Sequence, residues 1–269
     1  MNRKRAFNMA WCIVLLQMVL VIFKPYAGSV FLNLFFGEMT IVIPILIGLF
    51  ILKIEGREDI KNALGIKGMK IEHIAITILI AIAFHFFIYT YMPLVNVGLV
   101  RLFGDVEYVL PKSDLASIFL LCVMAPVLEE LLMRGVVLTL LRRAGDLWAI
   151  IFSALAFALI HINAVSIVQI FFMGMLLGVL RIRTGSVLAP ILLHSISNFM
   201  TFVTLNHTIS YINVLTIASM AMFPILLWLF MERTEGVVKI KKRAKSFGRS
   251  PAMAIVILVF LAINIYQLI

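Results

Sequence analysis

The chain has 269 residues, of which 63% are hydrophobic and 13% are charged, and its formal net charge is +10. Soluble domains carry about 25% charged residues, so this composition excludes an ordinary soluble domain. The basic residues stand between long apolar runs, where they suit anionic lipid headgroups, and we expect the lipid bilayer rather than a nucleic acid as their partner.

Successive apolar runs predict the fold class, an all-α polytopic transmembrane helical bundle with about eight or nine spans. A helix needs about 20 apolar residues to cross roughly 30 Å of hydrocarbon. We read the whole chain, 1–269, as a single membrane domain. The predicted spans, in chain order, are 7–23, 30–52, 73–94, 114–141, 147–162, 165–180, 187–205, 211–231 and 252–269.

The connections between these runs alternate in charge. Basic residues gather at the N-terminus, in the 53–72 connection, at 142–143, at 181–183 and in KIKKRAKSFGR at 239–249. Basic connections favour the cytoplasmic side, which predicts a multi-pass cell-membrane protein with its N-terminus inside and, with nine spans, its C-terminus outside. The first run lacks a good cleavage site and is read as an uncleaved signal anchor. The 53–72 connection predicts either an interfacial helix or a plain loop.

The fourth span contains three charged residues, Glu129, Glu130 and Arg134. A charge at the centre of a membrane helix costs about 3 kcal/mol on insertion scales, so each residue needs a reason to be there. Glu130 and Arg134 are four residues apart and can form an ion pair on one face. Glu129 lies roughly 140° around the helix from Arg134 and is left without a partner in its own helix. Pro126, one turn earlier, removes a backbone hydrogen bond.

Polar residues on two other spans could serve as partners for Glu129. His161 ends the stretch FALIH in the fifth span, and His194 and Asn198 share a face of the seventh span in HSISN. Counted from the cytoplasmic ends at about 1.5 Å per residue, these side chains and Glu129 lie about 11–21 Å deep, which is compatible with one shared cavity near the middle of the membrane. Glu38 in the second span has no such company and is read as structural.

A carboxylate and an imidazole together can activate water, and imidazole and carboxamide N–H groups can stabilise an oxyanion where little water competes. This pattern predicts amide hydrolysis, with Glu129 as the base, His161 as its helper, and His194 and Asn198 as the oxyanion site. Nucleophilic catalysis by serine is disfavoured because no GxSxG occurs. Two histidines and a glutamate would also suit zinc, but HExxH is absent, so we expect no cofactor and keep zinc as the alternative.

Two other classes of function remain open. A non-catalytic membrane scaffold or immunity protein would keep the same residues as a structural polar network. A proton-coupled transporter would use the glutamate and the histidines as a proton relay. Transporters are often built from inverted repeats, and the chain has no second EExxxR-like span, which weighs against this class.

Three motifs, in order and each within an apolar run, resemble those of a known family. EELLMR matches EExxxR, FALIH matches FxxxH and HSISN matches HxxxN. Over about 114–205 the chain thus resembles the CPBP family, which includes type II CAAX prenyl endopeptidases and Abi-type, bacteriocin-linked relatives. The resemblance implies an intramembrane glutamic endopeptidase acting on a peptide or membrane-tethered protein, either a prenylated CAAX-like tail or a bacteriocin-like peptide. It assigns water activation to the first glutamate, Glu129, and support of the cavity to Glu130 and Arg134. It also assigns assistance to His161, and the oxyanion site to His194 and Asn198.

Overall fold

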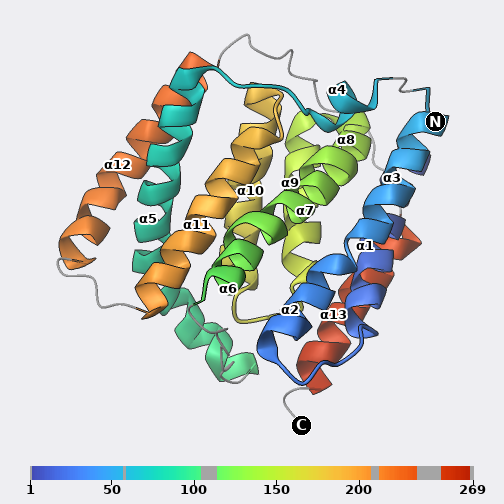
Figure 1. Ribbon diagram of the computed structural model, residues 1–269, viewed down its shortest axis with the longest axis horizontal. Helices are drawn as coiled ribbons and strands as arrows, with labels where there is room; N and C mark the ends of the chain where they lie inside the picture. Colours follow the sequence, from blue (N-terminus) through green and yellow to red (C-terminus); the bar gives the residue numbers. More distant parts are fainter. Residues whose placement is uncertain (1, 57–58, 104–113, 207–211, 235–249, 267–269) are drawn as a thin grey trace.

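The computed structural model describes all residues except 1, 57–58, 104–113, 207–211, 235–249 and 267–269. The described residues form helices and no strand (Figure 1). This agrees with the predicted all-helical class. The elements are α1 (Arg3–Ile22), α2 (Val30–Met39), α3 (Val42–Ile54), α4 (Ile60–Leu64), α5 (Ile71–Phe103), α6 (Leu115–Phe119), α7 (Ala125–Glu130), α8 (Leu138–Leu141), α9 (Asp146–Ile160), α10 (Ile167–Thr184), α11 (Leu188–Asn206), α12 (Ile212–Arg233) and α13 (Pro251–Tyr266).

Within the described residues, seven helical segments are long and apolar enough to cross a membrane, as a multi-pass membrane protein requires. The predicted count of eight or nine spans is not confirmed, because the fifth and ninth apolar runs form helices of only 15 and 16 residues, α9 and α13. At about 1.5 Å per residue these helices reach roughly 22–24 Å, which is less than the hydrocarbon thickness. The basic stretch 239–249 lies outside the described residues, and the predicted orientation stays a prediction.

The second predicted span is broken into α2 and α3 by a turn at Thr40. The side chain of Gln17 on α1 donates to Thr40 Oγ1 (3.0 Å), which itself donates to the carbonyl of Gly37 (2.6 Å). A buried glutamine therefore fixes the bend. Beyond it, α3 packs against the 131–137 segment, where a Cβ on Gly48 would collide with Val136.

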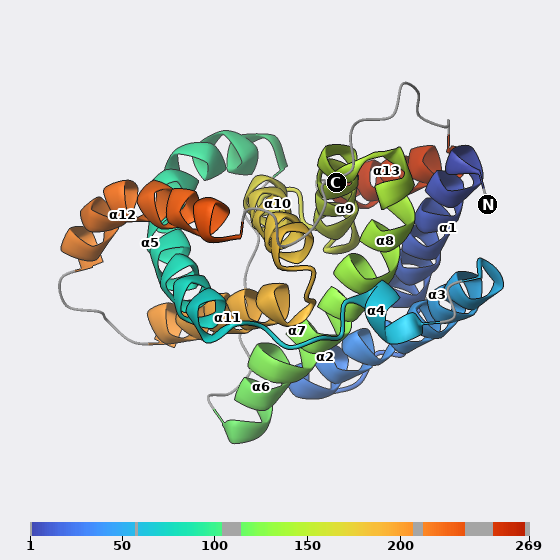
Figure 2. The ribbon, with the colours of Figure 1, turned by 90° about the horizontal axis from the view of Figure 1, so that it is seen from above.

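The 53–72 connection contains the short helix α4, and its predicted position at the membrane interface stays a prediction. Asp59 caps its N-terminus, and Gly65 ends it in the left-handed conformation with φ +76°. The carbonyl of Ala63 accepts hydrogen bonds from Thr139 (3.0 Å) and Arg181 (3.2 Å). These bonds attach the connection to α8 and α10 at one end of the bundle (Figures 1 and 2).

Helices α9 and α10 form a closely packed antiparallel pair. A Cβ built on Gly174 would lie 2.9 Å from Ala154 Cα, and one on Gly178 would lie 3.1 Å from Ile150. Small residues four apart let helix backbones approach closely, and here they allow α9 and α10 to pack in close contact.

The C-terminal helix α13 packs against α1 and α9 (Figure 2). Its Asn264 is buried, and Oδ1 of this residue accepts from the backbone N–H of Ala164 in the turn between α9 and α10 (2.9 Å). The ninth apolar run thus supports the turn that follows His161.

Candidate active site

The helix at 115–144 combines α-helical and π-helical turns, and this irregularity determines where Asn198 binds. Residues 120–124 and 131–137 are π-helical, with the N–H of Ala125 donating to the carbonyl of Leu120. Pro126, next along the chain, has no N–H to give to Leu121 in the same pattern. The side-chain Nδ2 of Asn198 donates to that carbonyl instead (2.9 Å). Such π-helical turns occur frequently at functional sites because they widen a helix and free backbone groups.

The predicted pair of Glu130 and Arg134 is formed and fully buried, with both side chains 0% exposed. The guanidinium donates to Glu130 Oε1 (3.0 Å) and to the carbonyl of Gly174 on α10 (3.0 Å). It also lies over the ring of Phe157, 4.4 Å from the centroid, in cation–π geometry. Arg134 therefore links the 115–144 helix to α9 and α10.

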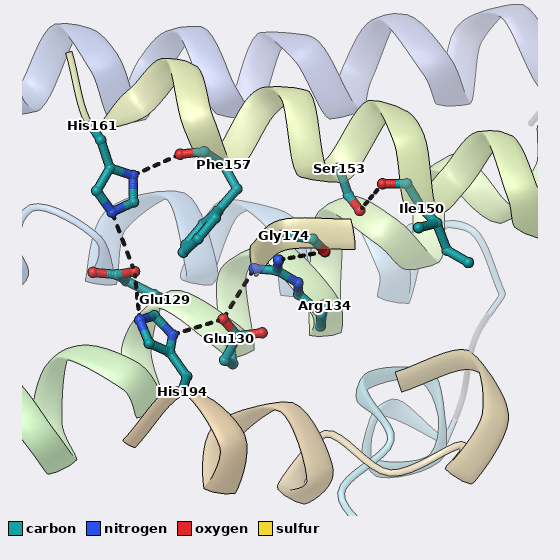
Figure 3. Close-up of polar contacts among 9 residues, drawn as sticks. All are labelled: Glu129, Glu130, Arg134, Ile150, Ser153, Phe157, His161, Gly174 and His194. Carbon is teal, nitrogen blue, oxygen red and sulfur yellow. Dashed lines mark hydrogen bonds and ion pairs between the residues drawn. The ribbon is translucent and has the colours of Figure 1, made fainter. Parts of the chain in front are cut away.

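Glu129 points towards two imidazoles from other helices (Figure 3). Its Oε2 lies 4.0 Å from Nε2 of His161 and 3.9 Å from Nε2 of His194. The same oxygen is buried and has no hydrogen-bond partner. The separations are too long for direct hydrogen bonds, so neither imidazole closes onto this oxygen.

The second nitrogen of each ring fixes its protonation. Nδ1 of His161 lies 2.7 Å from the carbonyl of Phe157, and Nδ1 of His194 lies 3.0 Å from Oε1 of Glu130. Carbonyls and ionised carboxylates only accept hydrogen bonds, so both Nδ1 atoms carry hydrogens. In the neutral rings, both Nε2 atoms then present lone pairs towards Glu129.

His161 sits at the C-terminal end of α9, where the chain leaves the helix. The next residue, Ile162, has φ +52°, a left-handed conformation that is rare for a β-branched residue. Backbone strain of this kind costs about 1–3 kcal/mol and persists where the surrounding structure imposes it. The Ala164–Asn264 hydrogen bond lies in the same turn.

Several partners in this network were not predicted from the sequence. Glu130 binds His194 as well as Arg134, so the two adjacent glutamates both face the same imidazole. The ring of Phe157 lies edge-on to both histidine rings, at 4.7 and 5.6 Å between centroids. The FxxxH spacing placed Phe157 and His161 on one face, but nothing local indicated that His194 would meet the same ring.

Asn198 lies one turn beyond His194 on α11, and its amide donates to the backbone of Leu121 rather than to Glu129. This bond uses one of the two N–H groups of the amide. The signal for this contact was the proline at 126, because the carbonyl it leaves without a donor requires one from elsewhere.

The donor set of Glu129, His161 and His194 does not fit a zinc ion as placed. Among the described residues, no group of three or more His, Cys, Asp or Glu is arranged to hold a metal. Adjacent ligands of tetrahedral zinc, with bonds of about 2.0–2.1 Å, lie about 3.3 Å apart, whereas these oxygen–nitrogen separations are 3.9 and 4.0 Å.

Known proteins resemble the central part of this chain in sequence. The model of the family described as type II CAAX prenyl endopeptidase Rce1-like matches residues 111–200. An Escherichia coli protein described as an uncharacterized 24.3 kDa protein is 33% identical over 101 residues, which is 35% of this chain and 45% of that protein. The chain therefore spans less than half the length of this relative. No solved structure matches.

The match at 111–200 includes EELLMR, FALIH and HSISN, the motifs on which the resemblance was based. The central part of the chain is therefore Rce1-like, which confirms the predicted relationship to the CPBP family.

Proposed function

We propose that this protein is an intramembrane endopeptidase that hydrolyses a peptide bond without a metal, using water activated by Glu129. One observation carries the proposal: a buried carboxylate oxygen without a partner lies between two imidazole nitrogens, 3.9 and 4.0 Å away. A structural ion pair would be closed by direct contacts, as the Glu130–Arg134 pair is. Glu129 Oε2 instead faces two imidazole nitrogens without a direct contact to either.

The number of hydrogen-bond donors and acceptors around the proposed water indicates which group carries an additional proton. A water among Glu129 Oε2 and the two Nε2 atoms has two hydrogens to donate and would face three acceptors. One of the three groups must therefore carry an additional proton and donate to the water. His194 suits this role, because the carboxylate of Glu130 at its Nδ1 stabilises an imidazolium ring.

The reaction follows from these positions. Water donates a hydrogen bond to Glu129, and its oxygen attacks the substrate carbonyl carbon while Glu129 takes the proton. The carbonyl oxygen becomes an oxyanion, which accepts from protonated Nε2 of His194 and from the second N–H of Asn198. When the C–N bond breaks, the proton on Glu129 moves to the departing nitrogen, giving an amine and a carboxyl product.

The other residues of the cluster hold these groups in place. His161 accepts from the water through Nε2, because its Nδ1–H is held by the carbonyl of Phe157. Glu130 orients His194, and Arg134 compensates the charge of Glu130. Arg134 does not reach the proposed water position through any contact of its own, so we assign it a positioning role.

The proposed substrate is a peptide or a membrane-tethered protein tail that enters from the bilayer or the cytoplasmic side. A prenylated CAAX peptide is the first probe, because the Rce1-like family is described by that class of substrate. The apolar surroundings of the site suit a lipid-modified chain, since its hydrocarbon needs no aqueous passage.

The test reconstitutes the full chain in liposomes with a farnesylated CAAX peptide and follows cleavage by mass spectrometry. Performed in ¹⁸O-labelled water, hydrolysis places one label in the new carboxyl group. Glu129→Gln should lower kcat by about 10²–10⁴-fold, the usual contribution of a general base. Glu232→Gln, an exposed carboxyl at the end of α12, is the matched control and should keep full activity.

Two results would decide against the proposal. Full cleavage by Glu129→Gln would remove this residue from the chemistry. Proton-coupled uptake into vesicles, with no change in peptide termini between wild type and Glu129→Gln, would favour a carrier. If the farnesylated probe is not cut, the membrane-peptide termini of cells with either form identify the substrate class.

A further inference from the structure

Helix α3 and the 115–144 helix run side by side in the same direction, and two contacts fix their register (Figure 1). Gly48 packs on Val136, and seven residues further along both helices Glu55 pairs with Arg143 (2.5 Å). Counting seven residues back from the first contact brings residue 41 level with Glu129.

Glu38 lies one turn beyond residue 41, just before the bend that Gln17 fixes at Thr40. Glu38 therefore lies on the same side of this contact as Glu129, towards the start of both helices. Both views place α2 beside the helix that carries Glu129 (Figures 1 and 2).

The carboxyl groups of Glu38 and Glu129 share a low-dielectric environment. Oε2 of each is buried and lacks a hydrogen-bond partner, and the two groups interact electrostatically. Lys24 also acts on Glu38, but its Nζ donates to the carbonyl of Asn33 (2.9 Å), and among the described residues it forms no ion pair with Glu38. Two carboxylates in such surroundings do not readily ionise together, because their repulsion is poorly screened.

The charge distribution decides which carboxyl keeps the proton. Glu129 has His161 and His194 at 4.0 and 3.9 Å, and it interacts electrostatically with Arg134. Arg134, and His194 in the protonated form proposed above, stabilise the ionised form of Glu129, whereas His161 presents a lone pair to it. Glu38 forms no ion pair among the described residues, which favours Glu38 as the neutral member of the pair.

We propose that Glu38 is a further positioning residue of this site, a neutral carboxylic acid whose O–H donates a hydrogen bond towards the Glu129 carboxylate. The inference rests on the proposed role of Glu129 as the base. The donated bond keeps Glu129 ionised and fixes the oxygen that receives the proton from water. The titratable and charged groups facing the pair are Lys24, His161, His194 and Arg134.

The first experiment measures pH profiles of kcat for wild type, Glu38→Ala and Glu38→Gln in liposomes with the farnesylated CAAX peptide. Loss of a hydrogen bond to an ionised group should lower kcat about tenfold or more in Glu38→Ala, with KM little changed. The O–H of Glu38 favours the ionised form of Glu129. Its loss should therefore move the acidic limb of the kcat–pH profile to higher pH by about one unit. Glu38→Gln retains an N–H donor and should stay close to wild type.

The opposite direction of shift would overturn the proposal. If Glu38 were ionised, its removal would relieve repulsion, and the acidic limb would move to lower pH. An unchanged profile in Glu38→Ala would show that Glu38 does not act on the base at all.

A second measurement does not depend on peptide cleavage. Infrared spectra at neutral pH should contain a protonated carboxylic acid C=O band that is lost in Glu38→Gln and kept in Glu232→Gln. If the peptide is not cleaved but this band behaves as expected, the proposed function fails while the neutral Glu38 stands. If the band is unaffected by Glu38→Gln, the neutral acid is excluded whatever the activity.

Discussion

Replacing Arg134 by Met tests the charge network most directly. The substitution keeps a long apolar side chain but removes the ion pair with Glu130 at 3.0 Å, the hydrogen bond to Gly174 at 3.0 Å and the cation over Phe157 at 4.4 Å. Glu130 then remains fully buried, and His194 stays in contact with it at 3.0 Å. Removing one member of a buried ion pair costs about 3–5 kcal/mol, because the other charge is left uncompensated.

The double variant Glu130→Met/Arg134→Met removes both charges and should be less destabilised than Arg134→Met alone. What remains is an unpaired N–H on His194 Nδ1, which costs about 1–3 kcal/mol. Free energies of unfolding can be measured by titrating sodium dodecyl sulfate into mixed micelles. The reasoning fails if Arg134→Met costs less than about 1 kcal/mol, or if the double variant costs the sum of the two single changes.

Three further predictions concern packing, the π-helical turn and metal dependence. Gly174→Ala should cost about 1–3 kcal/mol in the same unfolding assay, because its Cβ would lie 2.9 Å from Ala154 Cα, whereas Gly68→Ala, with nothing within 4 Å, should change stability by less than about 0.5 kcal/mol. Equal costs would contradict the close helix contact. Asn198→Leu should cost about 1–3 kcal/mol by leaving the Leu121 carbonyl without its side-chain donor, and a neutral result would show that this carbonyl is satisfied otherwise. Peptide cleavage should survive a strong chelator, and a loss of activity that added zinc restores would establish a metal site.

The helical class and most span positions followed from composition and run length, because crossing a bilayer imposes a minimum apolar length on each helix. The predicted span count is not confirmed, because the described parts of the runs at 147–162 and 252–269 form shorter apolar helices of 15 and 16 residues. Both runs are largely apolar. In the first, the helix ends at His161, and no glycine follows to indicate the end of the helix. Ile162 takes the left-handed conformation there, and local propensity disfavours such a residue at that position.

The site was predictable to the extent that its geometry is local. The spacing of four between Glu130 and Arg134 determines their pairing in almost any helix, and this pair is present. The same spacing argument left Glu129 without a partner in its helix, and its oxygen is indeed unpartnered. Whether Glu129 and Asn198 act in catalysis stays a prediction.

The sequence by itself determined which residues are polar within apolar helices and which of them share a helix face, since both follow from composition and a fixed helical repeat. Only the tertiary structure decided that His194 lies between both glutamates and that Asn198 binds the carbonyl Pro126 leaves free. The physical reason is that these helices are apolar on nearly every face. The sequence then does not distinguish a helix face that contacts lipid from one that contacts another helix. Close packing and polar contacts between helices decide which helices pack together.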